Sequence, residues 1–102
     1  LNAYTYYKTG KYKSAIVAFK NALKQYPESK RREEIMYLIV DSGYRLASNS
    51  ISEKQTDRYL SMLDSYLSFK EEFPESTHIK SLDRMAQQAR DYLDRNNKDN
   101  NI

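Results

Sequence analysis

The clearest alternation of apolar and polar positions lies between Gly10 and Pro27. Its apolar residues recur at steps of three and one, the spacing of a helix with a single buried face. These residues are Tyr12, Ala15, Ile16, Phe19, Ala22, Leu23 and Tyr26. Because Ala15 and Ala22 are small, a neighbouring helix can approach closely at both positions. We therefore predict a helix over residues 11–25 that forms one arm of a hairpin.

The same periodicity predicts four more helices, over residues 1–9, 30–48, 53–72 and 76–95. Gly10 ends the first helix, because glycine adopts a positive φ without strain. A proline follows the second and the fourth helix and disfavours helix at the residue before it. Residues 96–102 are polar apart from the last, so we predict a flexible tail there.

Serines are placed to start the later helices. Ser29 and Ser76 precede the third and fifth helices, where a hydroxyl can cap free backbone N–H groups. Ser52 and Gln55 have the spacing of a capping box, in which each side chain bonds to the backbone N–H of the other residue. Leu1 reads as a mid-helix residue, so we expect the chain to be a fragment of a longer protein.

An internal repeat organises these helices. Tyr26-Pro27-Glu28-Ser29 returns as Phe73-Pro74-Glu75-Ser76 after 47 residues, each time between two helices. Aligning the two copies places Phe19 on Tyr66, Tyr12 on Tyr59 and Ala15 on Met62. We predict an all-α domain over residues 1–95, with a hairpin at 1–26, a lengthened hairpin at 30–73 and a lone cap helix at 76–95.

Composition agrees with a folded module, since 30% of the residues are charged and 13% are aromatic, most of them tyrosine. The charge is unevenly distributed. Residues 1–32 contain eight basic residues and one acidic residue, a net charge of +7, and the remainder has a net charge of −4. Such a chain can pair head to tail or meet an acidic partner at its basic end, or the charge can simply solvate one face.

The parts of a catalytic or metal site are missing. The chain has one histidine, His78, and no cysteine, and we interpret Glu33-Glu34 and Glu71-Glu72 as solvated helix ends. We therefore predict no enzyme activity, no cofactor, no metal and no small-molecule substrate. No apolar run approaches the roughly 20 residues of a membrane span.

A protein-binding surface is predicted on the first helix of each hairpin, which lines a groove in helix-hairpin arrays. If Met36, Ile39 and Val40 face the core, four residues of the third helix point outward, and three residues of the first helix occupy matching places. The predicted surface consists of Tyr4, Tyr7, Lys8, Tyr37, Asp41, Tyr44 and Arg45. Tyrosines with interspersed charge are favoured at protein interfaces.

Two alternatives stay open for these residues. Tyr37 and Tyr44 can instead pack against the next hairpin. The mixture of tyrosines with Lys and Arg near the N-terminus could also hold single-stranded nucleic acid by stacking and phosphate contact. The repeat core accounts for several of those tyrosines, and the chain has no recognised nucleic-acid motif, so nucleic acid is the weaker alternative.

The pattern Gly10-x-Tyr12-x-x-Ala15-x-x-x-Phe19-x-x-Ala22-Leu23-x-x-x-Pro27 resembles the second half of a tetratricopeptide repeat, preceded by Ala3-x-x-Tyr6. The 47-residue period exceeds the usual 34 of that repeat. The lengthened hairpin, with Tyr44-Arg45-Leu46-Ala47 and Phe69 to Ser76, is similar to the C-terminal part of the BamD family of outer-membrane assembly lipoproteins, in its Bacteroidetes-like form.

This resemblance implies antiparallel hairpins of tetratricopeptide type, about five helices in a right-handed solenoid with a C-terminal capping helix. It implies a periplasmic, non-catalytic scaffold, tethered to the outer membrane by a lipidated cysteine upstream of residue 1. Its partner would be the periplasmic domains of the subunit that inserts β-barrels. The alternative is a general peptide- or nucleic-acid-binding tetratricopeptide protein of the cytoplasm, unrelated to outer-membrane assembly.

Overall fold

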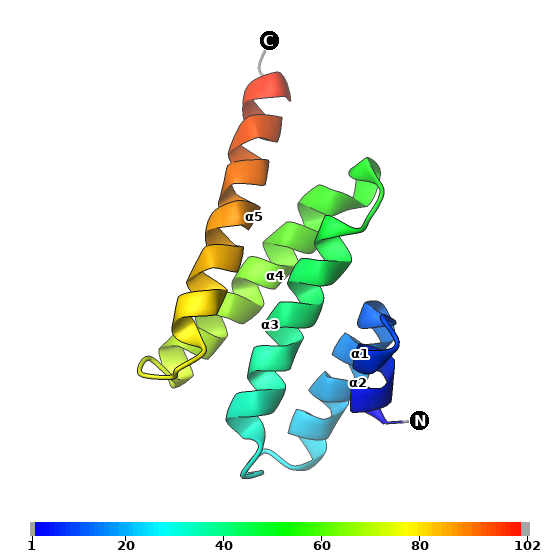
Figure 1. Ribbon diagram of the computed structural model, residues 1–102, viewed down its shortest axis with the longest axis vertical. Helices are drawn as coiled ribbons and strands as arrows, with labels where there is room; N and C mark the ends of the chain where they lie inside the picture. Colours follow the sequence, from blue (N-terminus) through cyan, green and yellow to red (C-terminus); the bar gives the residue numbers. More distant parts are fainter. Residues whose placement is uncertain (1, 101–102) are drawn as a thin grey trace.

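The computed structural model describes residues 2–100, and within these residues it contains five α-helices and no strand (Figure 1). The helices are α1 (Ala3–Lys8), α2 (Tyr12–Gln25), α3 (Arg32–Ser48), α4 (Ser52–Glu72) and α5 (Ile79–Asn100). The predicted all-α fold of consecutive helix hairpins is confirmed.

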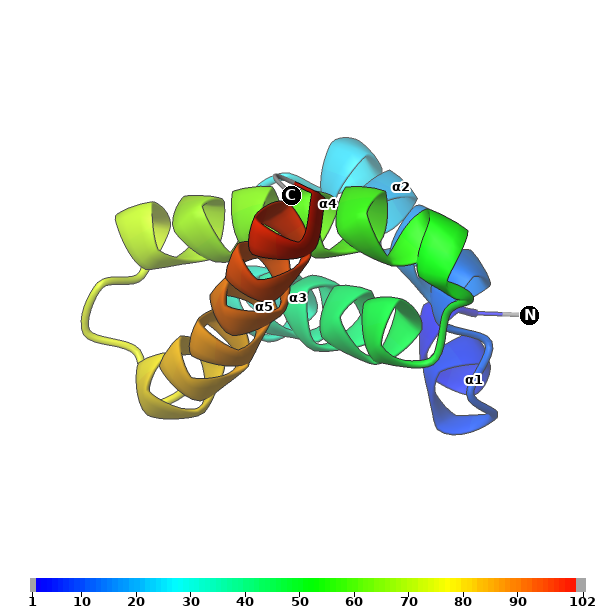
Figure 2. The same ribbon diagram turned by 90° about the horizontal axis from the view of Figure 1, so that it is seen from above.

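The helices form two layers, with α2 and α4 in one layer and α1 and α3 in the other, while α5 begins beside α3 and slants towards the level of α4 (Figure 2). Each helix packs against the next along the chain, and α3 additionally contacts α5. α3 is therefore the central element. The sequence explains this position, because its middle section is apolar on nearly every side and must be covered by several neighbours.

Two groups of buried side chains meet on α3. One group joins α1 and α2 to the first half of α3, and consists of Ala3, Ala15, Phe19, Ile35, Leu38 and Ile39. The other joins the rest of α3 to α4 and α5, and consists of Val40, Ala47, Tyr59, Met62, Tyr66, Phe69, Leu82, Ala86 and Ala89. Half-buried Tyr37 packs against both groups.

The two proline turns have the same geometry. The residue before proline has φ −131° and ψ 68° at Tyr26, and φ −128° and ψ 62° at Phe73. In each turn the serine hydroxyl accepts a 3.1 Å hydrogen bond from the backbone N–H two residues later, Ser29 from Arg31 and Ser76 from His78. The repeat in the sequence is therefore also a repeat in structure.

Two predicted helix starts lie too early in the sequence. Since Ser29 and Ser76 cap a turn rather than the helix itself, α3 begins at Arg32 and α5 at Ile79. Gly10, with φ 78°, ends α1 as predicted.

The predicted capping box is wrong. Ile51 occupies the N-cap position of α4, with no side-chain cap bond, and Ser52 is already helical. Gln55 does not reach back to the backbone of Ser52. Its Nε2 donates a 3.0 Å hydrogen bond to the carbonyl oxygen of Ala47, which ties the start of α4 to the end of α3.

The predicted end of the last helix is also wrong, because α5 continues past Arg95 to Asn100. Residues 96–100 contain neither proline nor glycine, so nothing in the chain stops the helix there. The rest of the predicted tail, residues 101–102, lies outside the described part of the chain.

Candidate protein-binding face

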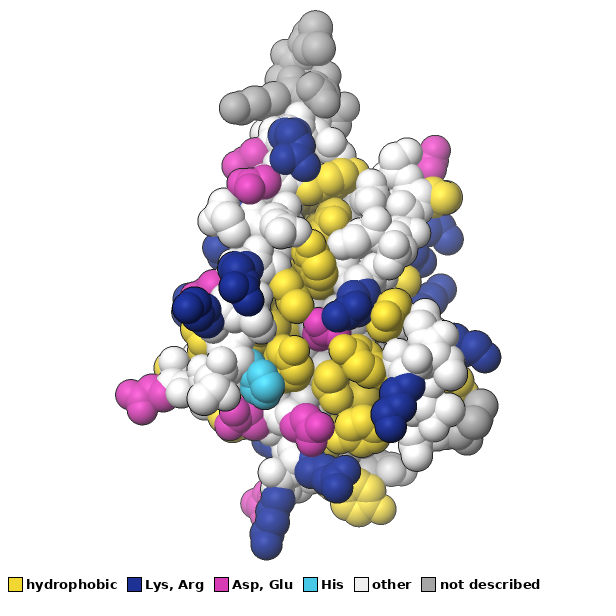
Figure 3. All heavy atoms as spheres, in the orientation of Figure 1, with side chains coloured by type: hydrophobic (Ala, Val, Ile, Leu, Met, Phe, Trp, Pro, Cys, Tyr) yellow, Lys and Arg dark blue, Asp and Glu magenta, His cyan; other side chains and the backbone are white. Residues whose placement is uncertain are grey.

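The predicted surface residues come from α1 and α3, which lie in the layer where α5 begins. Figure 3 shows this face, with hydrophobic side chains gathered in the valley between α5 and α3 and again between α3 and α1. Basic and acidic side chains border both valleys. We call this surface, formed by α1, α3 and α5, the odd-helix face.

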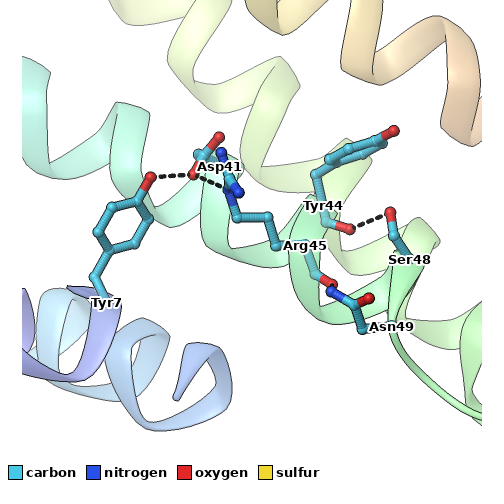
Figure 4. Close-up of polar contacts among 6 residues, drawn as sticks. All are labelled: Tyr7, Asp41, Tyr44, Arg45, Ser48 and Asn49. Atoms are coloured by element: carbon cyan, nitrogen blue, oxygen red, sulfur yellow. Dashed lines mark hydrogen bonds and ion pairs between the residues drawn. The ribbon is translucent and has the colours of Figure 1, made fainter. Parts of the chain in front are cut away.

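A hydrogen-bonded network joins α1 to α3 at the centre of the face (Figure 4). The Tyr7 hydroxyl donates a 2.5 Å hydrogen bond to Oδ2 of Asp41, and Nε of Arg45 lies 2.8 Å from the same oxygen. Asp41 is only 1% exposed, whereas the Arg45 side chain is 48% exposed. A buried carboxylate is tolerable here because a charged and a neutral donor satisfy it.

This network corrects one prediction from the sequence. Asp41 was expected to point outward beside Tyr37, Tyr44 and Arg45, and that orientation is wrong. Its carboxylate is covered because it bridges two helices through Tyr7. Of the charged pair on α3, only the Arg45 side chain reaches solvent.

The network also shifts two pKa values. Burial, and secondly the hydrogen bond to Asp41, raise the pKa of Tyr7 to about 12. The hydrogen bond to Asp41 raises the pKa of Arg45 above its usual range. At neutral pH, Tyr7 therefore remains a donor and Arg45 remains a cation.

Tyr37 and Tyr44 both contact α5 or the turn before it. The ring of Tyr37 stacks on His78, with ring centroids 3.8 Å apart and an interplanar angle of 10°. The Tyr44 hydroxyl donates a hydrogen bond to Oε1 of Gln88, and its ring lies 6.3 Å from that of Tyr59. Both tyrosines therefore pack against the next element of the chain, as the alternative interpretation of the sequence predicts. Both tyrosines remain half-buried.

On α1, Tyr4 and Lys8 are in different environments. Tyr4 packs edge-on against Phe19 at 5.3 Å between ring centroids, and its buried hydroxyl has no hydrogen-bond partner among the described residues. Lys8 is exposed. Tyr4 therefore belongs mainly to the core, while Lys8 and Arg45 are the exposed cations among the predicted residues.

Sequence reasoning missed the contribution of α5 to this face. Met85 and Tyr92 pack against the second core group, and the rings of Tyr92 and Tyr59 lie 4.8 Å apart. Gln88 accepts the hydrogen bond of Tyr44 on α3. Met85, Gln88 and Tyr92 are spaced by three and four residues beside the apolar stripe of α5, and this spacing is the signal in the sequence for their shared side of the helix.

Comparison with protein families gives a match over residues 1–98 to a family that is described as outer membrane lipoprotein. The chain belongs to this BamD-like family of outer membrane lipoproteins. A comparison with curated proteins found no match.

Membership of the BamD-like family associates the chain with the outer membrane. None of the described helices combines the length and apolar character needed to cross a membrane. Among the residues whose side chains the structure describes, no three carboxylates or imidazoles are grouped so that they could hold a metal ion.

Proposed function

We propose that this BamD-like chain is a non-catalytic periplasmic scaffold of the machinery that inserts β-barrel proteins into the outer membrane. The odd-helix face would hold the periplasmic domains of the barrel-inserting subunit. The family match supports the association with this process, and the arrangement of the face supports a protein as the ligand.

The observation that carries the proposal is that the tyrosines of this face are held in place. Tyr37 is stacked on His78, Tyr44 is bonded to Gln88, and Tyr7 is bonded to Asp41. Because their rotamers are already fixed, a partner would lose little side-chain entropy by binding them. Half-buried aromatic rings with nearby cations are the groups that contribute most at protein interfaces.

The exposed cations of the face favour a partner of opposite charge. Lys8 and Arg45 are the exposed cations that the predicted residues contribute to this face. A partner surface with exposed carboxylates would be attracted and oriented by this charge.

Binding of the purified periplasmic domains to the chain tests this function. Replacing Tyr37 and Tyr44 together by alanine should weaken binding at least about tenfold, because each ring contributes contact area near the centre of the face. Tyr26→Ala is the matched control, since Tyr26 is 67% exposed and lies at the end of α2, in the other layer. Circular dichroism checks that helicity is retained.

Two outcomes would contradict this assignment. One is unchanged binding by the double variant with helicity intact, and the other is an equal loss in Tyr26→Ala. Tyr44→Phe separates packing from hydrogen bonding, because it keeps the ring and removes the bond to Gln88.

For the parent protein we propose a periplasmic location, with a lipid anchor on a cysteine upstream of residue 1. The description of the family as outer membrane lipoproteins supports this location. Replacing that cysteine by alanine in the parent protein should move it from the membrane fraction to the soluble periplasmic fraction. Unchanged fractionation would contradict the anchor without affecting the binding face.

A further inference from the structure

The layer opposite the odd-helix face contains a groove between α2 and α4, with α3 as its floor. It consists of two adjoining hollows of about 220 and 310 Å³. Lys20, Ile39 and Ser65 line both hollows, so the groove is continuous. We call it the even-helix groove. The proposed function does not use it.

The groove is apolar on its floor and on the α2 side. Ile39 and Met36 of α3 and Leu23 of α2 line one hollow, and Met62 lies at the base of the other. Val17 of α2 is 56% exposed at the edge. An apolar surface of this kind is stabilised when a partner removes it from water.

Three small side chains line the groove from α4. Ser61, Ser65 and Ser68 follow one another at steps of four and three, so they lie along one side of the helix, and all three line the groove. Small residues leave room for another helix to lie close to α4. Arg58 to Ser68 spans about 15 Å along α4, which matches about three turns of a helix.

The groove is bordered by positive charge. Lys13 and Lys20 line it from α2, a helix without any acidic residue, and Arg58 lines it from α4. Asp64 is the one acidic residue that lines either hollow. An occupant with carboxylates along its edges would be attracted to this border, and a basic occupant would be repelled.

We propose that the even-helix groove docks an acidic amphipathic helix of a protein partner, with its apolar face toward Ile39 and Val17 and its carboxylates toward Lys13, Lys20 and Arg58. Apolar anchors spaced along one face are the usual way in which a helix binds a groove. Since the groove and the odd-helix face lie in opposite layers, the scaffold can hold two partners at once.

The burial of its lining residues favours a helix over a lipid surface. The apolar side chains that line the groove are buried or half-buried, apart from Val17, which is 56% exposed. The flat surface of a bilayer would therefore reach few of them. Lipid binding is therefore kept as an outcome of the experiment.

The test uses the full 102-residue chain and a stapled peptide helix of about four turns, with leucines on one face and glutamates on the other. A matched peptide has lysines in place of the glutamates. Fluorescence anisotropy should show that the acidic peptide binds at least about tenfold more tightly than the basic peptide, and that added salt weakens its binding. Amide shifts should locate it at Val17, Ser61 and Ser65.

Ser65→Tyr should fill the groove and weaken binding of the acidic peptide at least about tenfold, because the new ring occupies the space of the peptide. Thr56→Tyr is the matched control on the same helix, since Thr56 is exposed and lines neither hollow of the groove. Lys20→Glu should weaken binding of the acidic peptide. Lys8→Glu should leave binding unchanged, because Lys8 lines neither hollow of the groove.

The proposal is overturned if the two peptides bind equally or not at all, or if Ser65→Tyr behaves like Thr56→Tyr. Sedimentation with phosphatidylglycerol vesicles, in the absence of peptide binding, would assign the groove to lipid and also overturn it. The alanine variant of Tyr37 and Tyr44 should bind the acidic peptide normally, so failure of the odd-helix face and failure of the groove are distinguishable.

Discussion

Tyr7 of α1 donates a 2.5 Å hydrogen bond to Asp41 of α3, a carboxylate that is almost completely buried. The two residues are 34 positions apart in the sequence. The bond therefore fixes the short first helix to the central helix, and its strength depends on the phenolic proton.

Stability should fall at alkaline pH through this bond. The folded chain holds the Tyr7 proton more tightly than the unfolded chain, since the pKa rises from 10.0 to about 12 on folding. The stabilisation that the Tyr7–Asp41 bond contributes is therefore complete below pH 10 and is lost as the pH rises through about 12. Urea denaturation at several pH values should show a decline that is smaller in Tyr7→Phe than in the unmodified chain.

The same variant should be less stable at neutral pH by about 1–3 kcal/mol, because the buried Asp41 loses one of its two donors. Tyr26→Phe is the control for loss of a phenol at an exposed position. If Tyr7→Phe declined as steeply as the unmodified chain above pH 10, another group would be responsible.

Phe19→Ala should lower the free energy of unfolding by about 3–5 kcal/mol. Phe19 is 1% exposed and forms a T-shaped pair with Tyr4, so truncation leaves a cavity between α1 and α2. Val17→Ala on the same helix should change it by less than about 0.5 kcal/mol, because Val17 is exposed. A loss below about 1 kcal/mol for Phe19→Ala in chemical denaturation would show that the buried face of α2 is misassigned.

Gly43→Ala should not give the usual gain of about 0.5–1 kcal/mol for replacing a helical glycine. A Cβ at this position would lie 3.3 Å from Cβ of Met62, so α3 and α4 would have to move apart slightly. Gly43→Val should destabilise the chain by about 1–3 kcal/mol. Thermal unfolding of the two variants measures both effects, and a more stable Gly43→Val would contradict the close approach.

Arg32→Gln should reduce the sensitivity of the chain to acid. Arg32 holds the pKa of Glu72 below its usual value and ties the start of α3 to the end of α4. This contribution is present above the unfolded pKa of Glu72 and is lost as the pH falls through the lowered value. Both side chains are about one-third exposed, so the effect at neutral pH should be below about 1 kcal/mol.

The spacing of apolar residues, together with the glycine and prolines near helix ends, was enough to predict the helices. Apolar spacing located each of them, and Gly10 and the two prolines gave three of the ends within a residue or two. Local capping was harder to predict. Ser52 and Gln55 have the spacing of a capping box, but Gln55 bonds to Ala47 of the preceding helix, a choice that depends on how α3 and α4 meet.

The candidate site was only partly predictable for a related reason. The helical spacing of Tyr37, Asp41, Tyr44 and Arg45 was readable, but their partners come from elements distant in sequence. Asp41 is buried because Tyr7 reaches it, and Tyr44 is held because Gln88 of α5 lies opposite. The even-helix groove was not predicted at all, because the spacing of the serines on α4 does not show that α2 lies beside them.

The position of Tyr37 has a consequence for how the chain unfolds. Repeat arrays often lose their units one at a time, because each unit contacts only its neighbours. Here Tyr37 packs into both core groups, and both groups depend on α3. Opening either half would expose side chains of the other, so we expect the two halves to unfold as one cooperative unit, with α3 as the helix that both require.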